Sequence, residues 1–310
     1  MRWATYRHPG GDEDRVGLVV DERLYGLPQG VTLLELLGDP DRLAEAGAHA
    51  GDDPAEVVSV DEVRLSAPIP RPPAVRDFSA FEQHVTNARR ARGLGIDPAW
   101  YEQPVFYFSN PHAIVATGAD VAVPPGSSAL DYELEVAAVV GLAGRDLAPE
   151  QATRHIAGFT VLNDWSARDL QRREMALQLG PVKGKDFATT LGPHLVTPDE
   201  LEPHAAGQAY DLTMTARVNG REYSRANLAD VHWSFGEMVA HASRGTWVSP
   251  GDVIGSGAAG TGCILELSLL HGHDAYPWLE PGDEVTLEVE RLGAITNRVV
   301  EGRPLQPLRR

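Results

Sequence analysis

Two carboxylates stand in an apolar segment of this chain, in Asp131-Tyr-Glu-Leu-Glu-Val-Ala-Ala-Val-Val140. Side chains alternate along a strand, so Glu133 and Glu135 share one face. The remaining residues of 132–140 are apolar on both faces apart from a tyrosine, which predicts a buried strand. Unpaired carboxylates are costly to bury and are normally protonated, paired with cations or bound to metal. The alternative is a solvated sheet edge at which both glutamates are exposed.

Two further acids lie where they could join this pair. Asp164 follows the apolar run 159–163 and precedes a predicted helix over 166–179, and Asp77 stands seven residues before His84. The alternative role for Asp164 is an ordinary helix N-terminal residue. Three or four oxygen ligands suit a hard cation such as Mg²⁺, Ca²⁺ or Mn²⁺. Zinc fits less well because the sequence has no His/Cys cluster with zinc spacing.

A cation and an amide donor are predicted near the same acids. Arg168 and Gln171 stand three residues apart and therefore on one face of the predicted helix, close to its Asp164 end. Metal, cation and amide could converge there. Alternatively, Arg168 only neutralises Glu133 or Asp164, and Gln171 is a solvated helix residue.

The elements that must position these residues are mostly strands. Apolar alternation predicts strands over 2–7, 15–24, 114–123, 132–140, 159–163, 210–218, 253–255, 264–270, 284–291 and 294–300, and helical patterns cover 31–37, 78–92 and 166–179. Strands and helices do not alternate regularly, which argues against a doubly wound fold or an α/β barrel. We therefore expect a mixed β fold with a minor helical content.

A proline-rich connector divides the chain. In Ala67-Pro-Ile-Pro-Arg-Pro-Pro73 the closely spaced prolines disfavour both helix and central strand. We predict a small N-terminal α+β domain over residues 1–66, with a scaffolding role, and a catalytic domain over residues 67–310. The length of 310 residues accommodates both.

Composition excludes several classes of partner. The formal net charge is -17 and no Lys/Arg-rich run occurs, which argues against binding nucleic acid or an anionic membrane. No segment approaches the roughly 18 apolar residues of a membrane span, and the N-terminus has no signal-peptide pattern, so we expect a cytoplasmic protein. Cys263 is the only cysteine and has small or apolar neighbours, which predicts a buried structural thiol.

Six segments resemble the motifs of the fumarylacetoacetate hydrolase family, in the family's order and over about residues 70–300. The most specific lies within residues 158–171. They are Arg76-Asp-Phe-Ser-Ala-Phe-Glu-Gln-His-Val-Thr-Asn87, Asp131-Tyr-Glu-Leu-Glu135, Gly158-Phe-Thr-Val-Leu-Asn-Asp-Trp-Ser-Ala-Arg-Asp-Leu-Gln171, Gly184-Lys-Asp-Phe187, Pro250-Gly-Asp-Val-Ile-Gly-Ser256 and Leu292-Gly-Ala-Ile-Thr-Asn297.

The resemblance implies a catalytic domain of β-roll or β-sandwich type, a homodimer and a divalent cation, with Mg²⁺ expected first and Mn²⁺ or Ca²⁺ as alternatives. It also implies that His84 is the general base, oriented by Glu266, and that Arg168, Gln171 and Lys185 stabilise developing negative charge. The alternative for Lys185 is a surface loop position. The metal ligands that the resemblance implies are Asp77, Glu133, Glu135 and Asp164.

The match is weaker where the family contacts the rest of its substrate. Fumarylacetoacetase has a tyrosine at the position of Ser79, whereas Tyr107 resembles another of its substrate contacts. An expected arginine is offset, which leaves Arg90 or Arg92. Ala258 replaces an expected threonine, and we assign that hydroxyl's role to nearby Ser256.

The function implied is metal-dependent hydrolysis of a C–C bond in a small 1,3-diketo acid, an acylpyruvate or a compound like fumarylacetoacetate, with a role in aromatic catabolism. Within the family, the alternatives are a 2-oxo acid decarboxylase of the oxaloacetate type, a hydratase or an isomerase. Decarboxylase-like relatives place a glutamate where this chain has Asn87, which favours hydrolysis. A non-catalytic binding relative is disfavoured because His84 and Glu266 are both present.

Overall fold

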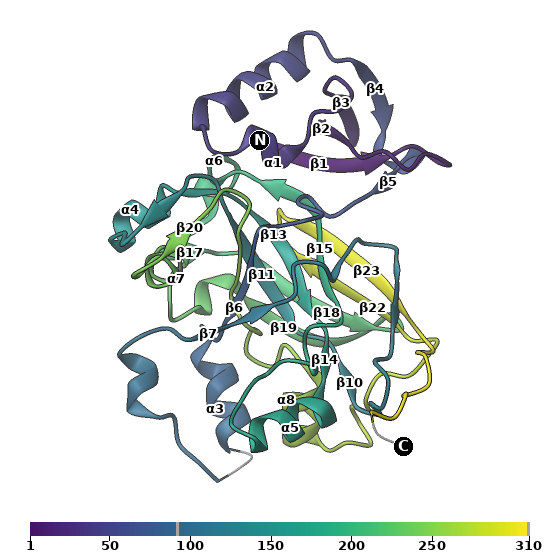
Figure 1. Cartoon of the computed structure of the whole chain (residues 1–310), viewed down its shortest axis with the longest axis vertical. Coiled ribbons are helices and arrows are strands. Elements are labelled where there is room, and N and C mark those ends of the chain that lie inside the picture. Colours follow the sequence, from purple (N-terminus) through teal and green to yellow (C-terminus); the bar gives the residue numbers. More distant parts are fainter. Residues whose placement is uncertain (91–92, 309–310) are drawn as a thin grey trace.

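A large mixed sheet forms the backbone of the molecule. The computed structural model describes residues 1–90 and 93–308, and Figure 1 shows the sheet running through its length. In spatial order its strands are β4 (Glu56–Ser59), β3 (Arg23–Gly26), β2 (Arg15–Val20), β1 (Arg2–Arg7), β15 (Thr189–Val196), β13 (Ile156–Asp164), β11 (Leu134–Val140), β21 (Val253–Gly255), β6 (Val75–Phe78) and β7 (Phe106–Ser109), with β5 (Arg64–Leu65) paired to β1 and β8 (Ile114–Val115) to β15.

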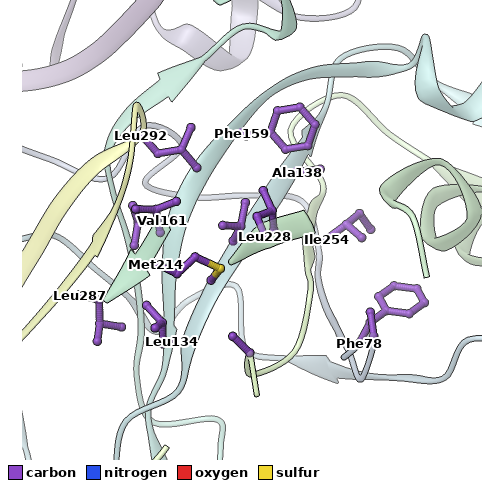
Figure 2. Close-up of a cluster of buried hydrophobic side chains, with 14 of the residues drawn as sticks. Phe78, Leu134, Ala138, Phe159, Val161, Met214, Leu228, Ile254, Leu287 and Leu292 are labelled. Atoms are coloured by element: carbon purple, nitrogen blue, oxygen red, sulfur yellow. The ribbon is translucent and has the colours of Figure 1, made fainter. Parts of the chain in front are cut away.

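A second sheet packs against the middle of the first. Its order is β19 (Arg221–Asn227), β18 (Thr213–Val218), β22 (Glu284–Val289), β23 (Gly293–Val300) and β9 (Asp120–Ala122). Figure 2 shows Val161 of the large sheet beside Met214 and Leu287 of the smaller one, all in one buried cluster. Two sheets that share a core form a sandwich, as the family resemblance implied, and the strand-rich sequence predicted the mixed β class.

Short ladders and helices complete the chain. The ladders are β10 (Leu130–Asp131) with β14 (Ser166–Ala167), β12 (Gly144–Arg145) with β20 (Trp247–Val248), and β16 (Ala205–Ala206) with β17 (Ala209–Tyr210). The α-helices are α1 (Leu33–Leu36), α2 (Pro40–Asp52), α3 (Glu82–Arg90), α4 (Pro149–Thr153), α5 (Arg168–Ala176), α6 (Pro198–Leu201), α7 (Phe235–Ala242) and α8 (Ile264–His271), and 3₁₀ turns cover Val60–Glu62, Pro98–Tyr101, Glu202–His204 and Leu228–Asp230. None of the helices in the described part of the chain is long and apolar enough to cross a membrane.

The N-terminal strands extend the large sheet. Strand β1 pairs antiparallel with β15, with Trp3 opposite Leu195. Trp3 also packs with Leu33 and Leu43 in an apolar cluster that includes Val139 and Leu195 of the central strands, so the N-terminal residues share a core with the rest of the sheet. The division of the chain at residue 66 stays a prediction.

The predicted strand over residues 264–270 is wrong, because this segment is helix α8. The sequence Ile-Leu-Glu-Leu-Ser-Leu-Leu is apolar at positions that suit either periodicity. The carboxylate of Asp131 accepts hydrogen bonds from the amides of Ile264 and Leu265, at 2.7 and 3.0 Å. This distant residue satisfies amide groups that have no partner in a helix's first turn, so the helix is stabilised by a contact that local sequence does not contain.

Candidate metal centre and adjoining pocket

Four buried carboxylates converge from neighbouring strands of the large sheet. Glu135 lies on β11 opposite Leu162 of β13, and Asp164 ends β13. Glu133 lies just before β11, and Asp77 lies on β6. Each of the four offers an oxygen within 4.8 Å of those of the other three. The shared face of Glu133 and Glu135 is therefore directed at Asp77 and Asp164, and the structure brings together all four predicted ligands.

A glycine makes room for this convergence. Gly255 of β21 pairs with Asp77 between the strands that carry Asp77 and Glu135. A Cβ at this position would lie 2.4 Å from Asp77 Oδ1 and 3.1 Å from Glu135 Oε2. The next glycine, Gly257, donates its amide to the same two carboxylates, at 3.2 and 3.0 Å. Any side chain at residue 255 would fill the space between them.

The electrostatics of the cluster favour binding of a cation. Burial and mutual repulsion raise the pKa of Glu135 and of Asp164 well above the usual range, and burial also raises the pKa of Asp77. Burial opposes ionisation of Glu133 too, but Lys185 and Arg168 outweigh it and hold the Glu133 pKa low. A bound cation would stabilise the ionised form of every member.

Two buried oxygens of the cluster have no hydrogen-bond partner among the described residues, Oε1 of Glu135 and Oδ1 of Asp164. Buried polar atoms are usually satisfied, so unpaired acceptors mark a place for a missing ligand. Four buried carboxylates with free oxygens fit a hard divalent cation of the Mg²⁺, Mn²⁺ or Ca²⁺ kind.

Lys185 and Tyr107 border the cluster. The Lys185 ammonium is 2.6 Å from Glu133 Oε2 and also contacts Asp164, and its side chain is only 3% exposed. Its alternative role as a surface loop residue is therefore wrong. The Tyr107 hydroxyl donates to Asp77 Oδ2 at 2.8 Å and lies against Asp164. Both residues are thus donors at the edge of the carboxylate cluster.

Arg168 links the cluster to helix α8. Its guanidinium donates to Glu133 Oε1 at 2.8 Å and to Asp131 Oδ2 at 2.7 Å. Gln171, one turn further along α5, accepts from Arg168 at 3.2 Å. Asp131 therefore fixes both Arg168 and the start of α8, the helix that carries Glu266.

His84, which is partly exposed, is paired with the buried Glu266. His84 Nδ1 lies 2.7 Å from Glu266 Oε2, and the Glu266 side chain is fully buried. The Glu266 carboxylate also accepts from the Asn87 side chain at 2.9 Å and from the Thr261 amide at 3.0 Å. An ionised carboxylate only accepts, so Nδ1 carries the proton and Nε2 is left as the basic nitrogen. Burial opposes the charge on His84, but Glu266 outweighs it and raises the His84 pKa.

One pocket of about 360 Å³ brings these groups together. His84, Tyr107, Lys185 and Gln171 line it beside Asp77 and Glu133. The other lining residues are mostly apolar: Phe78, Ser79, Val105, Phe106, Met175, Gly180, Pro181, Gly257 and Ala258.

One predicted contact, Ser256, is not among these lining residues. Ser256 is fully buried, its hydroxyl donates to the carbonyl of Gly257 at 2.8 Å, and it accepts from the amide of Val136 at 3.2 Å. This geometry gives Ser256 a main-chain role in place of the substrate contact that we predicted. Arg92 lies outside the described residues.

Two residues hold the site together in roles that sequence reasoning did not assign to them, Asp131 and Asn87. Asp131 stands two residues before Glu133 and so shares its strand parity, a signal that could have identified it. Asn87 stands one helical turn after His84 on α3, so its place beside the same partner could also have been inferred.

Known proteins resemble this chain over most of its length. Residues 74–300 match the family model described as fumarylacetoacetate (FAA) hydrolase C-terminal. A fumarylacetoacetase from Arabidopsis thaliana is 32% identical over 266 residues, which cover 68% of this chain and 63% of that protein. This chain thus spans less than two thirds of the plant enzyme. An oxaloacetate tautomerase from Bos taurus is 29% identical over 297 residues, which cover 94% of this chain and 87% of that protein.

A solved structure adds a metal to the comparison. The fumarylpyruvate hydrolase from Pseudomonas aeruginosa, crystallised with Mn²⁺ and pyruvate, aligns with a TM-score of 0.60 at 26% identity. The alignment covers 78% of this chain and 93% of that one.

Proposed function

Because the chain belongs to the fumarylacetoacetate hydrolase family, we propose that it is a divalent-metal-dependent hydrolase that cleaves a carbon–carbon bond in a 1,3-diketo acid. The observation that carries this proposal is the single pocket in which a buried carboxylate cluster meets a histidine oriented by a buried glutamate. Mg²⁺ is the proposed ion, and Asp77, Glu133, Glu135 and Asp164 are its proposed ligands.

A diketo acid suits the charges of this pocket. When bound, a divalent cation would neutralise the substrate carboxylate and polarise its oxo or enol oxygens. The protein itself contributes the donors around that position. Lys185 and Tyr107 fix the outer oxygens of the cluster, so the ligands are held in place before substrate arrives.

His84 is the proposed general base. Its Nε2 would accept a proton from water, and the hydroxide would attack the acyl carbonyl. Glu266 stabilises the imidazolium that results and keeps the ring in the required tautomer. The roles are those of an aspartate and histidine in an acyl-transfer site.

The leaving group of this step is an enolate, whose negative charge must be stabilised for the C–C bond to break. Arg168, Gln171 and Lys185 are the proposed donors. Lys185 and Arg168 are almost fully buried, and fixed donors in a dry site contribute several kcal/mol to such a transition state.

Oxaloacetate tautomerisation is the second candidate, since the relative from Bos taurus aligns with 94% of this chain. It needs the same enolate stabilisation but no attack on an acyl carbon. In that case His84 would move a proton between carbon and oxygen, and no product with fewer carbons would form. Decarboxylation and hydration or isomerisation are further alternatives that use the same enolate.

The test is a substrate panel with Mg²⁺ or Mn²⁺ and with EDTA as the control. We expect EDTA-sensitive cleavage of an acylpyruvate or of fumarylacetoacetate, and we expect His84→Ala to bind the metal and lose turnover. Interconversion of oxaloacetate tautomers, or CO₂ release from oxaloacetate, without cleavage of any diketo acid would contradict the proposal.

A further inference from the structure

We propose that the substrate of this pocket carries a neutral, apolar acyl group, and that the pocket discriminates against a second carboxylate at that end of the molecule. This inference rests on the proposed function, because it assigns the 2-oxo acid end of the substrate to the metal ion that the carboxylate cluster would hold. It concerns the other end, where the described lining has a different chemistry.

The pocket has an ionic end and an apolar end. At the ionic end, Asp77 and Glu133 meet Lys185 and His84. Tyr107, bonded to Asp77, and Gln171, bonded to Arg168, belong to this end too. The other lining side chains are apolar except for one hydroxyl, that of Ser79. They include Val105 and Met175, each 47% exposed, and the partly buried Phe106. Apolar side chains kept accessible beside a reaction site contribute binding energy only to an apolar ligand.

The cations that line the pocket already have partners. Lys185 is bound to Glu133 and Asp164, and His84 is bound to Glu266. Among the described lining residues, these are the only side chains that can carry positive charge. Among these described residues, a substrate carboxylate at the apolar end would find no partner of opposite charge to offset its lost hydration.

A negative charge also lies behind the apolar wall. The Glu174 carboxylate accepts hydrogen bonds from the amides of Val182, Lys183 and Gly184. A Cβ on the pocket residue Gly180 would stand 3.7 Å from its Oε2. Repulsion from the Glu174 carboxylate would further weaken the binding of a substrate carboxylate at this end.

Polar donors are scarce at the same end. The Ser79 hydroxyl is one, but a single neutral donor does not replace a cation for a carboxylate. Ala258 offers none, and Ser256 beside it is bonded to the main chain. The lining thus suits an alkyl or aryl acyl group better than a fumaryl group.

The first experiment measures binding and does not need turnover. 2-Oxohexanoate and 2-oxoadipate have the same chain length and differ by a terminal methyl or carboxylate. Titration calorimetry with the Mn²⁺-loaded protein should give a Kd at least ~10-fold lower for 2-oxohexanoate, a difference of about 1.4 kcal/mol. Equal or tighter binding of 2-oxoadipate would overturn the inference, whether or not the protein hydrolyses diketo acids.

A charge placed at the apolar end should reverse the preference. Met175→Arg is expected to tighten 2-oxoadipate and weaken 2-oxohexanoate, each by roughly 3-fold. Leu177→Arg is the matched control, since Leu177 is 81% exposed and does not line the pocket. If both variants change the two Kd values alike, the effect is one of net charge and Met175 does not face the acyl group.

Turnover separates this inference from the proposed function. We expect kcat/KM for a neutral acylpyruvate such as hexanoylpyruvate to exceed that for fumarylpyruvate by roughly 10-fold or more. Cleavage of both at equal rates would contradict the inference and leave the hydrolase intact. Cleavage of neither, with 2-oxohexanoate still bound more tightly, would contradict the hydrolase and leave the apolar end as described.

Discussion

The charges around His84 act in opposite directions. Burial and Arg168 oppose protonation of the ring, whereas Glu266 and Glu133 favour it. The outcome is a pKa raised above the usual value near 6.5, and the Glu266 pKa is lowered in turn because His84 outweighs its burial. A general base is active only when it is unprotonated. The raised pKa of His84 therefore makes it a stronger base but restricts its activity to higher pH.

Replacing Glu266 by glutamine should therefore move the acid limb of the pH profile. In Glu266→Gln the His84 pKa falls, and we expect the limb of kcat/KM to shift to lower pH while the plateau drops by roughly 10²-fold. Rates over a pH series at saturating metal would show both effects. Glu82→Gln is the control, an acid-to-amide change at an exposed position on α3. An unchanged limb in Glu266→Gln would show that a different group controls it.

Glu135 gives a prediction about metal removal. A ligand present at 100 times its Kd adds about 2.7 kcal/mol to the free energy of unfolding. We expect Mn²⁺ to raise the Tm of the wild type and EDTA to lower it. In Glu135→Gln most of this difference should vanish. The metal-free Tm should rise, because burial raises the pKa of Glu135 and the variant no longer has to keep that carboxyl protonated.

Scanning calorimetry with Mn²⁺ and with EDTA would measure both effects. Glu284→Gln, on the exposed start of β22, is the matched control and should keep the full metal effect. Equal stabilisation of Glu135→Gln by Mn²⁺ would remove Glu135 from the ligand set.

Much of the site could be predicted at the level of residues, because several of its side chains stand in short, recognisable sequence patterns. The alternation of Glu133 and Glu135 predicted a buried shared face, and both are at most 5% exposed. Ser256 was misjudged for a physical reason. A hydroxyl close to the site in sequence can be consumed by the main chain, and only the strand register of β11 and β21 shows that.

At the scale of elements, the loop between α5 and β15 is held to α5 by one side chain. Glu174 of α5 accepts three main-chain amides of this loop. Gly184 lies so close to α5 that a Cβ on it would stand 2.7 Å from the main-chain nitrogen of Gln171. Helix and loop thus act as one unit that presents Gln171 and Lys185 to the pocket.

Glu174→Gln should loosen that unit. An amide presents one acceptor oxygen in place of two, so we expect a stability loss of roughly 1 kcal/mol, discounted for partial exposure. We also expect faster hydrogen exchange at the amides of residues 182–184 and a lower kcat, since Lys185 follows directly. Exchange measured by mass spectrometry would test it. Glu45→Gln, on the exposed face of α2, should change neither quantity. Unchanged exchange at residues 182–184 would rule out the restraint.

Helix α8 shows why some elements escaped prediction. Its sequence suits a strand as well as a helix, and Asp131, which holds its first amides, lies 133 residues away. The register of β10 and β14 brings Asp131 to that place. Information of this kind lies in tertiary contacts and not in any local window.

At the scale of the whole molecule, the order of the strands could not be predicted from local sequence, because it too depends on tertiary contacts. The large sheet joins β1 to β15 and β21 to β6, pairs far apart in the chain. Apolar alternation predicts that such strands are buried but not which strand lies beside which. The strand-rich class was predictable, whereas the continuation of β1–β4 into the same sheet was not.

His194 lies where the N-terminal strands meet this sheet, and it gives a prediction about global stability. It stands on β15 beside the residue that pairs with Trp3. Burial and the nearby Arg2 lower its pKa to about 4 from a usual value of 6.5. The folded state therefore holds this ring neutral at a pH where the unfolded chain protonates it.

The sign follows from linkage, because the unfolded state binds more protons wherever the folded pKa is depressed. The full contribution of His194 is present above pH 6.5 and is lost as the pH falls toward 4. Between pH about 7.5 and about 5 the loss amounts to about 2 kcal/mol.

His194→Asn removes the titrating ring, so we expect the variant to be less stable at the higher pH and to lose about 2 kcal/mol less on acidification. Urea unfolding of wild type and variant at the two pH values measures the difference, in which the titration of the carboxylate cluster cancels. The exposed change His112→Asn is the control. A His194→Asn profile parallel to that of the wild type would mean that the ring is not held neutral by burial beside Arg2 and the Leu292–Gly293 turn.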